Sequence, residues 1–262
     1  MHCESYFYMI CCFVNECDKS EFVYDNRKEH SMKKIGLVGG IGPASTVEYY
    51  LGIIEKNRIA HGENIYPEIV IDSVNMAQHD KALAEKDYDR LCGYLLSSLL
   101  SLKAAGAEIA AITANTEHIV WEMICDRFPL PVISVVDAVI REIERMNFKR
   151  VLVFGTYFTL KNGLYENALK KQGITAIIPS NRDQEIIGNL IYPNLENGII
   201  IPNDKRKLVE IAEKYISEEK VDSLLLGCTE LPLAIKTGDV SVPILNTTEI
   251  HINEIYRSAS EM

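Results

Sequence analysis

The chain has 262 residues, of which 47% are hydrophobic and 24% charged, and its formal net charge is −10. This composition is typical of a folded globular protein with one large domain or two lobes. The negative charge argues against nucleic acid or an anionic membrane surface as the main partner.

The cysteines are unevenly spread: four of the seven lie within the first 17 residues. An odd, clustered set is not typical of a disulfide framework, so we expect a reducing, cytoplasmic location. Cys3, Cys11, Cys12 and Cys17 lack paired C-x-x-C spacing, so we expect no zinc site.

Residues 1–32 differ in character from the rest. Their apolar stretch at residues 6–14 is too short to span a bilayer, and no basic segment precedes it as in a signal peptide. A regular apolar run begins at Lys33. The sequence therefore predicts a peripheral extension over residues 1–32 and a folded domain from Lys33 onward.

From Lys33 onward, short apolar runs alternate with segments of helical periodicity, which predicts an α/β fold with parallel sheets covered on both faces. The predicted strands are 35–38, 69–73, 109–113, 132–134, 151–154, 175–178, 223–226 and 242–245. The first predicted helix begins near Ser45. The other predicted helices cover residues 91–102, 119–127, 137–146, 159–171, 204–217 and 247–257. The segments Ile112-Thr113-Ala114-Asn115-Thr116-Glu117 and Leu226-Gly227-Cys228-Thr229-Glu230 resemble each other, which indicates two similar lobes.

A glycine-rich segment, Gly39-Gly40-Ile41-Gly42-Pro43, follows the first predicted strand. Glycines permit close backbone approach to a ligand, and the following helix N-terminus attracts anions. The match to the dinucleotide-binding pattern is poor because Ser45 stands where a glycine is expected. The segment therefore favours a small carboxylate ligand over NAD.

Polar residues follow the third predicted strand, in the order Asn115-Thr116-Glu117-His118. Asn115 and Thr116 can hydrogen-bond a carboxylate or an ammonium group, and either can also cap a helix. His118 in such a place is more often a packing residue than a catalyst.

Cys228 follows the buried strand at 223–226, where ligands of parallel sheets usually bind. A helix beginning after Gly227 is expected to lower the pKa of the thiol. A thiolate can remove a proton from an acidic carbon, and a thiol can return it.

These three segments together resemble the aspartate/glutamate racemase superfamily, most closely its aspartate racemase branch. The resemblance implies two pseudo-symmetric Rossmann-like lobes with the ligand between them. It also implies a homodimer that uses neither metal nor cofactor, pyridoxal phosphate included. Two cysteines flank the substrate Cα in this family, and the matching positions imply Cys228 as one of them. The implied substrate-binding residues are Gly40, Ile41, Gly42, Asn115, Thr116, Gly227 and Thr229.

The second cysteine position of the family holds Ala114, which cannot carry a proton. Four interpretations remain open: a racemase with another group on the second face, a one-thiol decarboxylase or isomerase, a chain engineered at Ala114, and a non-catalytic binder of acidic amino acids. The candidates for the second face are Thr113, Thr116, Glu117, His118 and a bound water.

The resemblance predicts a lobe of residues 33–131 and 239–262 and another of residues 132–238. The predicted activity is racemisation of an acidic amino acid, aspartate or glutamate, by removal and return of the Cα proton. A second substrate carboxylate favours a cationic side chain in the site. The candidates near predicted strand ends are Lys81, Lys161 and Arg182, with Asn75 and Gln78 as further polar groups.

Overall fold

The structure is a computed structural model that describes residues 32–62, 65–192, 194–195 and 198–261. The predicted extension therefore lies outside the described residues, except for Met32, and so do the four N-terminal cysteines.

All eight predicted strands are confirmed, with small shifts at their ends. The strands are β1 (Ile35–Gly39), β2 (Ile69–Ser73), β3 (Ile109–Ile112), β4 (Val132–Ile133), β5 (Arg150–Gly155), β6 (Thr175–Ile177), β7 (Ser223–Gly227) and β8 (Ile244–Asn246). The α-helices are α2 (Pro43–His61), α3 (Met76–Glu85), α4 (Tyr88–Ala104), α5 (Trp121–Ile124), α6 (Val135–Arg145), α7 (Tyr157–Lys161), α8 (Leu164–Lys171), α9 (Asn181–Ile191), α10 (Pro202–Glu219), α11 (Leu231–Ala234) and α12 (Thr247–Ser260). Two 3-10 helices flank α5, namely η1 (Thr116–Val120) and η2 (Cys125–Arg127).

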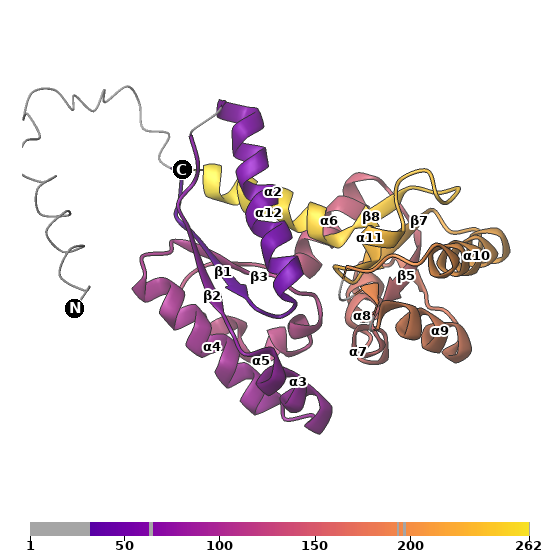
Figure 1. The fold of residues 1–262 in the computed structure, drawn as a ribbon, viewed down its shortest axis with the longest axis horizontal. Helices are drawn as coiled ribbons and strands as arrows, with labels where there is room; N and C mark the ends of the chain where they lie inside the picture. The colour runs from indigo at the N-terminus through magenta and orange to yellow at the C-terminus, as the bar shows by residue number, and fades with distance from the viewer. Residues whose placement is uncertain (1–31, 63–64, 193, 196–197, 262) are drawn as a thin grey trace, which may run out of the picture. The chain divides into compact units, whose positions relative to one another are not determined.

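The strands form two four-stranded parallel sheets with the same internal order (Figure 1). The first sheet has the order β2-β1-β3-β4 and the second has the order β6-β5-β7-β8. The loop after β3 is therefore the topological counterpart of the loop after β7, and the loop after β1 is the counterpart of the loop after β5. The predicted α/β class with two similar halves is confirmed.

Each sheet is covered on both faces, which explains the unbroken apolar runs of its strands. In the first sheet, Leu37 packs on the side of Tyr49 from α2 and Ile252 from α12, whereas Val38 packs on the side of Leu95 from α4.

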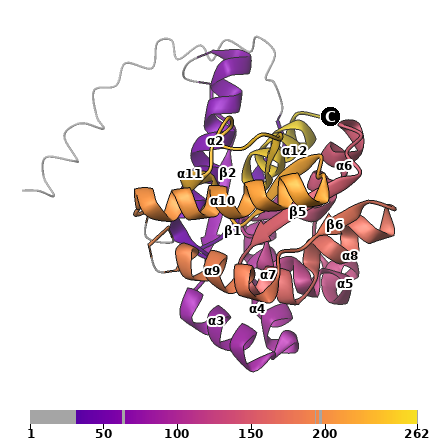
Figure 2. The same ribbon diagram turned by 90° about the vertical axis from the view of Figure 1, so that its right-hand side faces the viewer.

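The second sheet has the same arrangement. The side of Phe154 packs against α9 and α10, which lie in front of β5 in Figure 2. The side of Val153 packs against α6 and α8.

The predicted lobe boundaries at residues 131/132 and 238/239 stay a prediction. Strand β4 falls in the predicted second lobe but pairs with β3 of the first sheet. Strand β8 falls in the predicted first lobe but pairs with β7 of the second sheet. Helix α12 then packs against both α2 and α6. In the described part of the chain, no helix is long and apolar enough to cross a membrane.

Several helices differ from the predictions. Helix α2 begins at Pro43, and Ser45 does not cap it, because Ser45 Oγ donates to the carbonyl of Thr113 at 2.8 Å. The predicted helix 159–171 is split at Gly163, whose φ of 63° is left-handed. The predicted helix 119–127 is broken into η1, α5 and η2. Helices α3 and α9 were not predicted.

Candidate functional site

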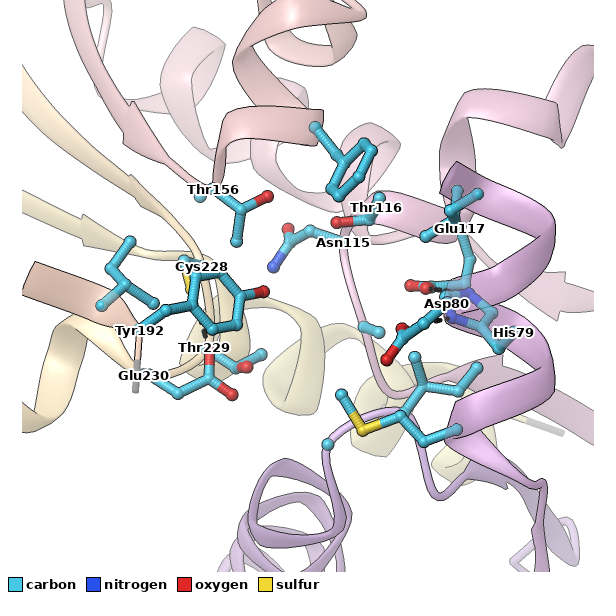
Figure 3. Close-up of a pocket in the computed structure, with 18 of the residues that line it drawn as sticks. His79, Asp80, Asn115, Thr116, Glu117, Thr156, Tyr192, Cys228, Thr229 and Glu230 are labelled. Carbon is cyan, nitrogen blue, oxygen red and sulfur yellow. Dashed lines mark hydrogen bonds and ion pairs between the residues drawn. The ribbon is translucent and has the colours of Figure 1, made fainter. Parts of the chain in front are cut away.

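A cavity of about 330 Å³ lies where the loops after β1, β3, β5 and β7 meet. Within each parallel sheet the carboxyl ends of the strands lie at one edge, and loops from these edges of both sheets line the cavity. Figure 3 shows the residues around it. The sequence-predicted residues that line the cavity are Ile41, Gly42, Ala114, Asn115, Thr116, Glu117, Gly227, Cys228 and Thr229.

Three predicted residues do not line this cavity. Gly40 has a φ of 85°, and a Cβ there would lie 2.4 Å from the Val74 carbonyl oxygen, so glycine is needed for the turn itself. The Thr113 hydroxyl is buried and donates to the Val38 carbonyl oxygen at 3.1 Å. Thr113 therefore holds the loop after β3 in place.

His118 is the third of these residues. Its Nε2 accepts the Val135 backbone N–H at 3.4 Å, and its ring stacks on Trp121 with centroids 5.0 Å apart. Burial lowers the pKa of His118 to about 4. His118 is therefore a neutral packing residue behind the cavity wall.

Cys228 is 3% exposed, and its thiol donates a hydrogen bond to Glu230 Oε2 at 2.8 Å. Burial raises the pKa of the Cys228 thiol well above its usual range, and the negative charge of Glu230 adds to the effect. The backbone N–H groups of Glu230 and Leu231 act in the opposite direction and are outweighed. The expected lowering of this pKa by a helix start is therefore wrong.

Asn115 belongs to a buried chain of hydrogen bonds between the two halves. The Thr247 hydroxyl donates to the Leu226 carbonyl at 2.9 Å, so its oxygen must accept from Asn115 Nδ2, 3.3 Å away. The Tyr165 hydroxyl donates to Asn115 Oδ1. This arrangement fixes the amide orientation and, within the described residues, leaves one N–H of Asn115 for a ligand.

A second chain of hydroxyl groups runs from Thr116 to Thr156. Thr159 Oγ1 lies 3.2 Å from Thr116 Oγ1 and 3.0 Å from Thr156 Oγ1. Thr156 lines the cavity and follows β5. Sequence reasoning missed it, although the matching strand order of the two sheets makes the loop after β5 the counterpart of the glycine-rich loop after β1.

The cavity also contains an ion pair that sequence reasoning missed. His79 Nε2 of α3 lies 2.6 Å from Glu117 Oε1, and His79 Nδ1 lies 3.3 Å from Asp80 Oδ1. Burial alone lowers the pKa of His79, but Glu117 and Asp80 outweigh it, so the pKa is raised overall. His79 is the partner that explains how Glu117 is buried.

The cavity carries more negative than positive charge. Asp80, Glu117 and Glu230 line it, and within the described residues it has no lysine or arginine. The structure does not bring the predicted polar candidates to the cavity, namely Lys81, Lys161, Arg182, Asn75 and Gln78. Within the same residues, no group of three or more His, Cys, Asp or Glu side chains could hold a metal ion.

The two-sheet architecture and these loops agree with a known family. The sequence profile described as Asp/Glu/hydantoin racemase matches residues 38–255. The chain belongs to this family. The family places it among the isomerases, and the predicted family membership is confirmed.

Individual relatives agree with the family. An aspartate racemase homologue from Pyrococcus horikoshii OT3 has a crystal structure with 35% sequence identity and a TM-score of 0.79, covering 88% of this chain and 100% of that one. The broad specificity amino-acid racemase RacX of Bacillus subtilis is 24% identical over 82% of this chain and 92% of its own length. The glutamate racemase of Aquifex aeolicus is 32% identical over half of each chain.

Proposed function

We propose that this protein is a cofactor-independent amino-acid racemase in which Cys228 carries the α-proton on one face of the substrate Cα. The observation that carries this proposal is the buried thiol on the cavity wall, hydrogen-bonded to Glu230. Family membership and the similarity to named amino-acid racemases support it.

Glu230 can accept the proton of the Cys228 thiol. The resting thiol is protonated because burial and Glu230 raise its pKa. When the thiol proton moves to Glu230 Oε2, the resulting thiolate can take the α-proton, and the electron pair of the C–H bond stays on Cα. The backbone N–H groups of Glu230 and Leu231 stabilise the thiolate. The protonated thiol can return a proton to the same face.

The substrate's α-carboxylate has several hydrogen-bond donors within reach. One N–H of Asn115 has no partner among the described residues, and Thr116, Thr156 and Thr229 present hydroxyl groups at the cavity. We assign these four residues to the α-carboxylate, whose delocalised charge they stabilise as the carbanion forms. The acidic substrate stays a prediction, and the charge of the cavity does not support it, because the described cavity residues supply no lysine or arginine for a second carboxylate.

The test is proton NMR in D2O with separate enantiomers of aspartate, glutamate, alanine, methionine, lysine and arginine. Wild-type protein should exchange the α-proton of at least one amino acid. Cys228→Ser should lower the exchange of one enantiomer at least about 100-fold, the usual scale of general acid–base catalysis, while binding is retained. Cys92→Ser is the matched control, since Cys92 is a buried thiol of α4 outside the cavity.

Other results would contradict the proposal. Binding without exchange would favour a non-catalytic binder. Neither exchange nor binding of any amino acid would favour the one-thiol decarboxylase or isomerase, whose substrate generates its carbanion differently.

A further inference from the structure

A buried carboxylate lines the cavity wall that faces Cys228. Glu117 is 1% exposed, and its Oε1 is paired with His79 Nε2 at 2.6 Å. Its second oxygen, Oε2, has no hydrogen-bond partner among the described residues. A carboxylate oxygen out of contact with water and without a partner is energetically costly, so its retention on the wall of a ligand cavity suggests a role toward the ligand.

The pair lies where a second proton carrier is needed. Glu117 lies three residues after Ala114 in the sequence, and both line the cavity from the segment that follows β3. Figure 3 shows Glu117 and His79 on the opposite side of the cavity from Cys228 and Glu230. The methyl group of Ala114 cannot exchange a proton.

Other cavity groups fit this task less well. The Thr116 hydroxyl is bonded to Thr159 and is a weak acid. The Asp80 side chain is 57% exposed, so water shields its charge. Among the described residues of this wall, Glu117 is the buried carboxyl group that contacts a second buried ionisable group, His79.

We propose that Glu117 is the proton carrier on the face of Cα opposite Cys228 and that His79 is its positioning residue and proton reserve. This inference rests on the proposed function and goes beyond it by assigning the second face. In one direction, the Cys228 thiolate takes the α-proton and leaves the C–H electron pair on Cα. A proton from the His79 imidazolium then passes through the Glu117 carboxyl to the opposite face of Cα.

The proton count closes in both directions. After this turnover Cys228 holds one proton more and the His79–Glu117 pair one proton fewer. In the reverse direction the Glu117 carboxylate takes the α-proton and the Cys228 thiol supplies one to the other face. Solvent restores the starting protonation of both walls between turnovers.

The experiment measures α-proton exchange in D2O for each enantiomer separately, with the amino acid on which the wild-type protein is most active. Cys228→Ser should stop exchange from one enantiomer and Glu117→Gln from the other, each by at least about 100-fold. His79→Gln should slow the same enantiomer as Glu117→Gln. Glu122→Gln is the matched control, because Glu122 is an exposed glutamate paired with Lys171 outside the cavity.

A rescue variant separates chemistry from misfolding. Adding Ala114→Cys to Glu117→Gln places a thiol at the same strand end and should restore exchange from the enantiomer that was lost. Unchanged exchange from both enantiomers in Glu117→Gln, or equal loss from both without rescue by Ala114→Cys, would overturn the assignment while leaving Cys228 in its role. An inactive wild-type protein would instead overturn the proposed function together with this inference.

Discussion

The sulfur of Cys228 lies 2.8 Å from Glu230 Oε2, inside a wall where the thiol is almost fully shielded from water. Two residues of one short loop are thereby coupled, so that the charge of Glu230 adds to the effect of burial in keeping the Cys228 thiol protonated. Burial is the main cause of the high pKa of the thiol, and the contact with Glu230 adds to it while also offering a route to deprotonation.

Replacing Glu230 by Gln should therefore separate these two effects. The pKa of Cys228 should fall, because the neighbouring negative charge is removed while burial stays. The exchange rate should nevertheless drop about 100-fold, since Gln cannot accept the thiol proton. The alkylation rate of Cys228 as a function of pH, followed by peptide mass spectrometry, measures the first effect. An unchanged or higher midpoint would contradict this account of the pKa.

The charge of the cavity predicts substrate preference. With three carboxylates and no described lysine or arginine, the cavity should bind amino acids with neutral or cationic side chains more tightly than aspartate or glutamate. Calorimetric titration of Cys228→Ser with alanine, lysine and aspartate checks the order without turnover. Asp80→Asn should reduce the difference in binding affinity between lysine and aspartate, because it removes one negative charge from the cavity. Tighter binding of aspartate by the unmodified cavity would contradict this prediction.

Two buried histidines should make the protein acid-sensitive. Burial lowers the pKa of His251 to about 3 and that of His118 to about 4. Both must stay neutral in the folded state but are protonated on unfolding below about pH 6.5, so stability should fall as pH drops from 7 to 5. The loss should be about 2 kcal/mol for each histidine at pH 5.

His79 acts in the opposite sense, because its pKa is raised. Its contribution to stability is fully present below about pH 6.5 and is lost as pH rises through the folded value. The two histidines with lowered pKa values outweigh His79, so the net free energy of unfolding should fall on acidification. Calorimetric melting from pH 7.5 to 5 measures the net effect, and His251→Gln should flatten the slope. A melting temperature that rises on acidification would refute this balance.

Thr159→Val removes a hydroxyl without changing the side-chain shape. Thr159 bridges Thr116 and Thr156, so the loss should cost about 1 kcal/mol of stability and raise KM more than it lowers kcat. Thr175→Val, at an exposed position of β6, is the control. A selective loss in kcat would assign Thr159 a closer role in the reaction.

The predicted homodimer has a candidate surface on α2. Val47, Leu51 and Ile59 are exposed and line one groove of about 680 Å³. Contiguous exposed apolar side chains of this kind mark interaction sites. Light scattering after gel filtration should give a dimer for the wild type and a monomer for Leu51→Glu. Leu100→Glu on α4, with similar exposure, should stay dimeric, and a monomeric wild type would contradict the prediction.

The strands and most of the cavity loops were predictable because both depend on local pattern. A strand buried on both faces is a continuous apolar run, and parallel strands bring their carboxyl ends to one edge. Helix α3 was missed because Met76 and Leu83 are the large apolar side chains among its ten residues and are too few for a clear helical pattern. The pairing of His79 and Glu117 was missed with it. Such a pairing joins segments 38 residues apart and has no local signal.

The pKa of Cys228 shows a second limit of prediction from the sequence. The loop sequence correctly places backbone N–H groups near the sulfur, and these groups do favour the thiolate. Burial depends on how β7 and α11 pack with the rest of the molecule, and it outweighs the local effect. The three hydroxyls of Thr116, Thr156 and Thr159 likewise come together only in the folded chain.

The route of the last strand and helix has a consequence for synthesis. Strand β8 pairs at the edge of the second sheet, and the following helix α12 then returns to cover the first sheet with Ile252 and Ile255. One face of the earliest strands, which α2 covers in part, therefore stays incompletely covered on the ribosome until residues 247–260 have emerged. The first sheet is begun early during translation but is among the last parts of the protein to be finished.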